Sequence, residues 1–448
     1  MRCFSILCLA ILVCSCGGGE SGVPLNMIDA RLVQADAAIR ADTCFVQSAK
    51  PSACNWHIDT YSPSNFAMRP NSGEAILVVD ILPALPTRAL RYKNRIEAYY
   101  RPVAERGLEP ASSQWQVPEI LWEVLNEFAG PDHVPAQRLE RLLPAIESAY
   151  GHLAAPLADA AHGSDVFALL ADANPAQPLV LVDTVDLFRI APQAYCDTTG
   201  SAASDERLAQ ASQHVAAQLN HIMREHNVHF VNFSAGHSLS VVTDGWTGAC
   251  GTAVPAQSVL HAKLRAYAPI YQALFSTPCV LAAQAAIDGT DLRSHPYDQA
   301  GASFGNRLRA GFFTKLASGL DDRGRGAGKE MGGWPSQGQA DIFLNTGVLP
   351  FRPFEFNATP LLQLGRYGVG LEPITRSTTS WVTPLALSYL IHVRHAQFSG
   401  EIMNDALIMK IFDVATPRQC PTLPKGQCIY QDPLLHGQVE AVRLGYRP

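Results

Sequence analysis

Short apolar runs alternate along the chain with longer stretches of helical periodicity. Residues 75–80, Ala-Ile-Leu-Val-Val-Asp, form a continuous apolar run that an acid closes, and residues 179–183, Leu-Val-Leu-Val-Asp, repeat the pattern. Such a run is typical of a buried parallel strand that delivers a side chain at its carboxyl end. Residues 205–227 have the pattern of a long amphipathic helix that leads into a further apolar segment. The alternation predicts an α/β fold with a mainly parallel central sheet flanked by helices.

Helical patterning also marks two other parts of the chain. Residues 119–128 and 138–150 have helical periodicity, so residues 81–150 are expected to form an insertion with its own helices beside the sheet. Near the C-terminal end, the apolar run at residues 385–393 and the segment at residues 397–415 predict two further helices.

A serine stands at the predicted start of the first of these two helices. Residues 379–384 read Thr-Ser-Trp-Val-Thr-Pro, which places Ser380 one residue before a helix with Pro384 in its first turn. At such a position the helix dipole and the free backbone N–H groups favour a developing negative charge. The same pattern is also that of an ordinary helix N-cap. Ser380 is therefore a candidate nucleophile, with helix capping as the alternative.

The segment around Ser380 resembles the nucleophile block of the subtilisin-like serine proteases. Thr379, Ser380, Thr383 and Pro384 match that block, whereas Thr378 stands where the family has glycine. The order of the candidate residues, an aspartate, then a histidine, then a serine, is also that of the subtilisins.

Five other segments resemble blocks of the same family, in the same order. Residues 162–170, which begin His-Gly-Ser-Asp, resemble the block with the general base, although Asp165 replaces a second histidine. Residues 75–80 resemble the strand that ends in the catalytic aspartate. Three further core strands are matched by residues 228–236, 278–286 and 340–347.

The resemblance implies a three-layer subtilisin-like fold and a catalytic triad. Ser380 would attack the substrate carbonyl, His162 would take its proton, and Asp80 would orient the imidazole and stabilise its cation. Asp183 is an alternative carboxylate, but it follows His162 in the sequence, against the family order.

Several residues near the expected site depart from the family pattern. Direct register puts Ala286 at the position of the family's oxyanion-hole asparagine, and Gln284 is the nearest amide that could replace it. Loss of such a donor costs a factor of roughly 10²–10³ in turnover. Thr378 adds a side chain where the backbone should run close to the substrate, and Ile81-Leu82 replaces the family's Ser/Thr-Gly. These departures leave open a catalytically inactive protein with the same fold.

The substrate implied by the resemblance is an extended peptide. Ser234, Ala235 and Gly236 would present their backbone to it by strand addition. The formal net charge of −6 gives no indication of nucleic-acid binding. We expect no cofactor and no bound metal, because the histidine spacings lack a supporting pattern of cysteines or acids. The oligomeric state is not predicted.

The N-terminus has the features of a targeting segment. Arg2 precedes an apolar run at residues 4–13, which is too short to span a bilayer stably. The following Cys14-Ser-Cys16-Gly-Gly-Gly resembles a bacterial lipoprotein signal, which implies cleavage before Cys16 and its acylation. This would place the protein in the bacterial cell envelope, at the outer membrane in a Gram-negative host. An ordinary secretory signal or an uncleaved anchor is the alternative.

The chain has eleven cysteines, four of them at or before Cys16. An exported protein can hold disulfides. The short spacings favour Cys44–Cys54 and Cys420–Cys428 as local pairs, with Cys196–Cys250 as a third and Cys279 as a buried free thiol.

The 448 residues, 47% of them hydrophobic, suffice for one large domain or two ordinary ones. We expect a signal peptide at 1–15, a tether and N-terminal segment at 16–72, a peptidase domain at 73–415 and a cysteine-clipped tail at 416–448. The expected function is that of a membrane-anchored serine endopeptidase. The alternative is an inactive protein of the same fold that acts as a binding or scaffold lipoprotein of the envelope.

Overall fold

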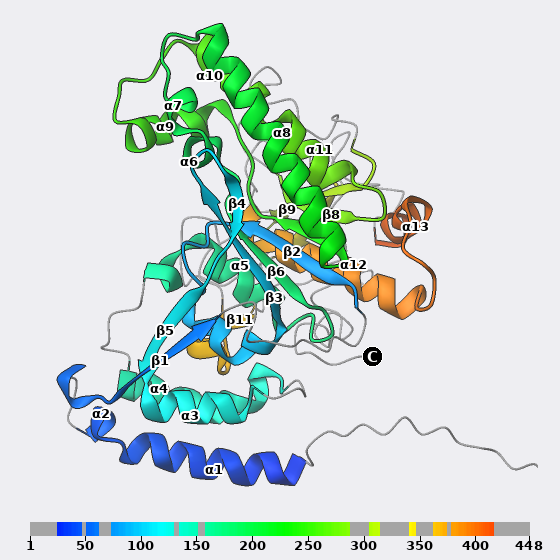
Figure 1. Cartoon of the computed structure of the whole chain (residues 1–448). Helices are drawn as coiled ribbons and strands as arrows, with labels where there is room; N and C mark the ends of the chain where they lie inside the picture. Colours follow the sequence, from blue (N-terminus) through cyan, green and yellow to red (C-terminus); the bar gives the residue numbers. More distant parts are fainter. Residues whose placement is uncertain are drawn as a thin grey trace, which may run out of the picture.

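A computed structural model describes residues 25–46, 51–61, 73–129, 134–150, 157–286, 304–313, 340–345, 362–373 and 378–415 (Figure 1). Cys16, Cys420 and Cys428 lie outside these residues, as does the expected C-terminal tail. None of the described helices is long and apolar enough to cross a membrane.

The described α-helices are α1 (Leu25–Ala41), α2 (Thr43–Val46), α3 (Glu119–Glu127), α4 (Leu143–Tyr150), α5 (His162–Leu170), α6 (Leu187–Ile190), α7 (Pro192–Tyr195), α8 (Ala202–Glu225), α9 (Leu239–Cys250), α10 (Gln257–Arg265), α11 (Ala268–Ser276), α12 (Thr379–Gln397) and α13 (Asp405–Ala415). The short 3-10 helices are η1 (Pro51–Ala53), η3 (Thr87–Arg95), η4 (Ala136–Leu142), η5 (Leu157–Ala160) and η8 (Arg366–Gly368).

The described strands are β1 (Trp56–Tyr61), β2 (Ala75–Asp80), β3 (Ile96–Val103), β4 (Gly107–Pro110), β5 (Ser113–Pro118), β6 (Leu179–Asp183), β7 (Val228–Phe233), β8 (Leu281–Ala285), β9 (Arg307–Phe313), β10 (Ile342–Asn345), β11 (Leu362–Leu364) and β12 (Leu371–Pro373).

Eight strands form the central sheet, in the order β10-β9-β8-β7-β2-β6-β3-β4. Neighbouring strands are parallel except for β3 and β4, which form an antiparallel pair. The strand β2 lies between β6 and β7. The chain builds one half of the sheet from β2 to β4, returns through β6, and then crosses to the other side of β2 at β7. This makes β2 a topological switch point, and in open α/β sheets ligands bind outside the carboxyl ends of the strands at such a point.

Each face of the sheet carries its own hydrophobic core, because side chains alternate between the faces along each strand. Ile76 and Val78 of β2 pack with α5 and α12 on one face. Ala75, Leu77 and Val79 pack with α8 and α11 on the other. The helix layers on both faces confirm the expected three-layer α/β architecture with a mainly parallel central sheet.

The N-terminal segment is part of the packed body. Leu32, Ala35 and Ile39 of α1 are buried in the same core as Ile76 of β2. Figure 1 shows α1 beside α3 and α4, on the side of the molecule away from α8 and α10. Residues 25–46, which lie within the expected tether and N-terminal segment, therefore contribute to the core.

The insertion at residues 81–150 contains the two predicted helical regions, which correspond to α3 and to η4 with α4. It also supplies β3 and β4 to the central sheet, which the sequence pattern did not predict. The strand β9 was likewise not predicted. The helix α13 begins at Asp405, eight residues later than expected, because α12 extends to Gln397.

Two disulfide bonds are present in the described residues. They join Cys44 to Cys54 and Cys196 to Cys250, as expected, and Cys279 is a free thiol. Cys279 is half-buried rather than fully enclosed.

Candidate active site

The first candidate residue, Asp80, is the last residue of β2. It follows Ile76 and Val78 in the two-residue alternation of the strand, so its side chain lies on the face covered by α5 and α12. The residue is only 4% exposed. Its Oδ1 atom accepts a hydrogen bond of 2.7 Å from the backbone N–H of Ile81. The strand therefore delivers a buried carboxylate to the switch point of the sheet.

His162 is the first residue of α5, and its Nδ1 atom lies 2.7 Å from Asp80 Oδ1. The next residue, Gly163, explains how helix and strand come so close. Its N–H donates to the carbonyl of Ile81 at 3.0 Å. A Cβ atom at Gly163 would lie 2.6 Å from Leu82 Cγ and 2.7 Å from the same carbonyl. The glycine is thus required for the approach that joins His162 to Asp80.

The Asp80–His162 pair fixes the protonation pattern of the imidazole. Because a carboxylate only accepts hydrogen bonds, Nδ1 must carry a proton, and in the neutral ring Nε2 is then left as the basic nitrogen. Burial lowers the pKa of His162, but the hydrogen bond and charge of Asp80, with the charge of Asp165, outweigh it and raise this pKa above its usual 6.5. The ring is therefore suited to accept a proton through Nε2 when the pH lies above this raised pKa.

Ser380 is the second residue of α12, because the helix begins two residues earlier than the sequence predicted. The helix begins at Thr379, so Pro384 lies beyond the first turn. The N-cap is Thr378, whose Oγ1 accepts a 3.3 Å hydrogen bond from the N–H of Trp381. Thr378, which stands where the resemblance places a glycine, thus has a capping role. Ser380 does not cap the helix.

Ser380 is half-buried, and its hydroxyl makes no hydrogen bond to a described residue, His162 included. The two residues are nevertheless neighbours through Trp381, whose indole stacks on the His162 imidazole with ring centroids 4.7 Å apart. In unliganded sites, catalytic hydrogen bonds are often long and tighten only when substrate binds. The structure brings Asp80 and His162 into contact. It places Ser380 next in sequence to Trp381, whose indole covers one face of the His162 ring.

The alternative carboxylate, Asp183, has other partners. It lies beside Asp80 in the register of β6 and β2. Its side chain is fully buried and forms ion pairs with Arg189 at 2.8 Å and Arg101 at 3.7 Å, and it accepts the N–H of Leu82 at 2.9 Å. Of the two neighbouring aspartates, Asp80 is the one bonded to His162.

The structure gives Gln284 a partner away from the candidate site. Ala282 and Gln284 alternate onto the face of β8 that packs against α8 and α11, opposite to α12. Gln284 is fully buried, and its Oε1 accepts from Arg307 at 2.8 Å. Ala286, just beyond the strand, is buried and has no side-chain donor. We therefore do not retain Gln284 as an oxyanion donor, because its amide is directed to the wrong face of the sheet.

The expected substrate-binding residues follow β7, the strand next to β2. Ser234 is buried, whereas Ala235 and Gly236 are half-buried in the segment that leads to α9. The Ser234 hydroxyl accepts from Asn232 Nδ2 at 2.9 Å. Asn232, fully buried on the α5/α12 face, was not singled out for the site from the sequence, although an amide between Val231 and Phe233 was a visible signal.

A second histidine–aspartate pair lies on the opposite face, with a buried histidine and a half-buried aspartate. His237 Nε2 is 3.4 Å from Asp186 Oδ1, but its ring is stacked on Tyr267 at 3.7 Å and its Nδ1 lies 3.0 Å from the Tyr271 hydroxyl. Its side chain is 8% exposed, against 32% for His162. A substrate can therefore reach His162 far more easily than His237.

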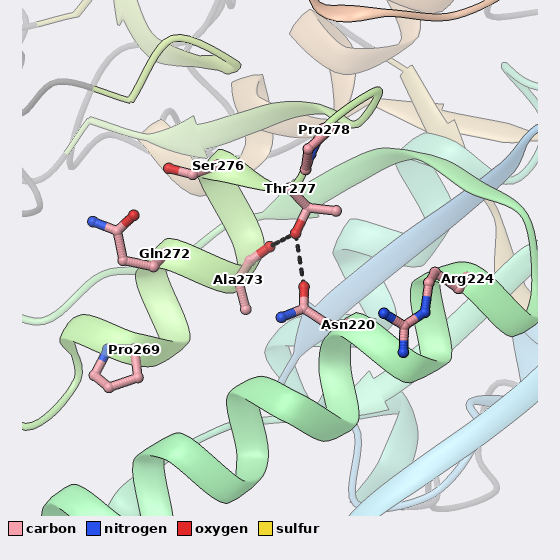
Figure 2. A pocket seen from close by; sticks show the side chains of 8 residues that line it. All are labelled: Asn220, Arg224, Pro269, Gln272, Ala273, Ser276, Thr277 and Pro278. Carbon is pink, nitrogen blue, oxygen red and sulfur yellow. Dashed lines mark hydrogen bonds between the residues drawn. The ribbon is translucent and has the colours of Figure 1, made fainter.

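A cavity of 590 Å³ lies between α8 and α11 (Figure 2). Arg224 and Thr277 in its lining precede β7 and β8, so the cavity is at the amino ends of parallel strands whose carboxyl ends are near Asp80. Figure 2 shows the Thr277 hydroxyl bonded to Asn220 Oδ1, at 2.8 Å. No group of three or more potential metal ligands is found in the part of the chain that the structure describes.

Neither a protein-family model nor a curated protein matches this sequence. Among solved structures, the prenylagaramide maturation protease PagA is similar, with 14% identity, 80% of this chain and 90% of that chain covered, and a TM-score of 0.34. A Pseudomonas sedolisin, a serine-carboxyl proteinase in complex with pseudo-iodotyrostatin, has 12% identity, coverage of 83% and 88%, and a TM-score of 0.31. These values are low, so the function has to be argued from the residues themselves.

Proposed function

We propose that this protein is a serine endopeptidase that hydrolyses peptide bonds with Ser380, His162 and Asp80. The observation that carries the proposal is the 2.7 Å contact between Asp80 and His162 at the switch point of the sheet. A buried carboxylate bonded to Nδ1 leaves the opposite nitrogen free to act as a general base. No cofactor enters this mechanism.

In the proposed reaction, Ser380 attacks the scissile carbonyl while His162 Nε2 accepts the hydroxyl proton. His162 then gives this proton to the leaving amine, and water hydrolyses the acyl-enzyme by the same route. Asp80 remains charged and stabilises the imidazolium as it forms. The backbone N–H of Ser380, in the first turn of α12, has no acceptor among the described residues and can donate to the oxyanion.

A catalytically inactive binding protein is the second candidate. Two observations favour it: the Ser380 hydroxyl makes no hydrogen bond to His162, and neither Gln284 nor Ala286 provides a side-chain oxyanion donor. In this alternative, the backbone of residues 234–236 would hold an extended peptide by strand addition without cleaving it.

A fluorophosphonate probe, which reacts covalently with activated serines, separates the two candidates. We expect the folded wild-type protein to be labelled at a single site and Ser380→Ala to remain unlabelled. Heat-denatured wild type is the control for non-specific reaction. Equal labelling of the two folded proteins, or none of the wild type, would favour the binding protein.

We also propose that the protein is exported and anchored to the cell envelope through acylated Cys16. The sequence pattern at residues 14–19 supports this proposal, and two disulfides in the described residues fit an oxidising compartment. Cells grown with a clickable fatty acid should yield a labelled protein in the membrane fraction. Cys16→Ser should be unlabelled, and persistent lipid on this variant would contradict acylation of Cys16.

A further inference from the structure

The imidazole of His162 is held at one edge and covered on one face. Asp80 holds the edge through Nδ1 at 2.7 Å. The indole of Trp381 covers the face, with the two ring planes inclined by only 29°. The backbone of Trp381 is held at the start of α12, because its backbone N–H donates to Thr378 Oγ1. The sequence did not indicate this contact, since Trp381 and His162 are 219 positions apart (381 − 162).

A stacked indole acts differently on the neutral and the protonated imidazole. The N–H groups of an imidazolium lie in the plane of its ring, so Asp80 and water can still reach them at the edges. The indole meets the ring face, where its π-electrons attract a cation. The contact should therefore stabilise the protonated ring more than the neutral ring.

The charged groups around His162 come from several elements. Asp80 ends β2, and Asp165 lies in the first turn of α5. Arg88 of η3 pairs with Asp165 at 2.7 Å and with Glu372 of β12 at 2.8 Å. The first turn of α12 carries no acidic residue. The contact of this helix with the His162 ring is therefore the Trp381 indole rather than a charge.

We propose that Trp381 is a positioning residue for His162. Its indole fixes the plane of the imidazole against Asp80 and stabilises the protonated ring that forms when His162 takes the serine proton. The catalytic consequence rests on the proposed protease function, whereas the effect on His162 itself does not.

The test compares the wild type with Trp381→Ala, Trp381→Leu and Trp381→Phe. The pKa of His162 is followed by NMR of protein labelled at its histidines, and the His162 signal is assigned by its absence in His162→Gln. Cation–π contacts of about 0.5–1 kcal/mol correspond to about 0.4–0.7 pH units, so Leu, which keeps an apolar cover on the ring, should lower this pKa by that amount. Ala also exposes the ring to water, which relieves the effect of burial, so its shift should be smaller. Trp381→Phe keeps an aromatic face, so the pKa of His162 in this variant should lie close to the wild-type value.

The Leu variant distinguishes an effect of the aromatic π-electrons from an effect of packing, because leucine keeps apolar volume at this position but has no aromatic ring. It should also fold if the Ala variant does not. An unchanged or raised pKa in the Leu variant, or a failure of Phe to restore it, would overturn the proposal. Fluorophosphonate labelling of the same proteins should be about tenfold slower for Leu than for Phe, since misplacement of a reacting group lowers rates steeply. If the pKa shifts but no protein is labelled, the inference holds and the protease function fails. If the Leu variant is labelled at the wild-type rate and the pKa of His162 is unchanged, the positioning role of Trp381 is wrong but the protease function stands.

Discussion

Asp80→Asn is expected to slow fluorophosphonate labelling of Ser380 by roughly 10⁴-fold, as for loss of the charge in other Ser-His-Asp triads. The amide has nearly the same shape as the carboxylate, so the fold should be retained. It can donate a hydrogen bond, however, and so no longer obliges His162 Nδ1 to carry the proton. The basic nitrogen is then directed at the amide at position 80 rather than at the serine. The measurement is the labelling rate at neutral pH.

The same substitution should also move the pH dependence of the residual rate. In the wild type, Asp80 helps to raise the pKa of His162, and the ring must be neutral to act as a base. The rate should therefore fall as the pH is lowered through this raised pKa. In Asp80→Asn that pKa is lower, so the decline should begin at a lower pH than in the wild type.

Asp183→Asn is the matched control, because Asp183 lies beside Asp80 in register and is equally buried. Its loss breaks ion pairs to Arg189 and Arg101, so it should lower stability. The labelling rate per folded molecule should change by far less than for Asp80. Equal losses in the two variants would mean that Asp80 has no special role.

Gly163→Ala is expected to disturb both the fold and the site. The added methyl group would lie 2.6 Å from Leu82 Cγ and 2.7 Å from the Ile81 carbonyl, which belongs to the backbone and cannot easily move. Overpacking of this kind costs about 1–3 kcal/mol in the free energy of unfolding. Relief of the clash would push the start of α5, and His162 with it, away from Asp80. We expect labelling to be about 10²-fold slower, as for a misplacement near 1 Å.

Gly248→Ala provides the comparison, since Gly248 lies inside α9 with nothing within 4 Å of the added carbon. There alanine should raise stability by up to about 1 kcal/mol through its better helix propensity. Chemical denaturation measures both variants. If Gly163→Ala is as stable and as reactive as Gly248→Ala, the close approach at Ile81 does not hold the pair together.

The predicted core strands and long helices came from signals that are local in the sequence. The apolar run that ends at Asp80 predicted β2, and the long amphipathic segment predicted α8. The strands β3, β4 and β9 were missed. β3 and β4 carry Tyr, Arg, Glu and Pro, and β9 alternates Arg with apolar residues, so none gives a continuous apolar run.

Within the site, the resemblance suggested which residues belong together, but not how they are oriented. Asp80 could be preferred over Asp183 only from family order, because both end equivalent apolar strands. Gln284 was a plausible donor until the strand register placed it on the opposite face. Trp381 was missed as a contact of His162 because stacking depends on two helix starts meeting in space. Position along the sequence does not reveal such a meeting.

The burial of α1 in the core of the central sheet has a consequence for cooperativity. Leu32, Ala35 and Ile39 share one hydrophobic cluster with Ile76 and Val78, so α1 and β2 should unfold in a single transition rather than in separate steps. A chain shortened to begin at residue 73 would leave the partners of these side chains exposed to water. The N-terminal boundary of the folding unit therefore lies at or before α1, about fifty residues ahead of the first strand of the central sheet.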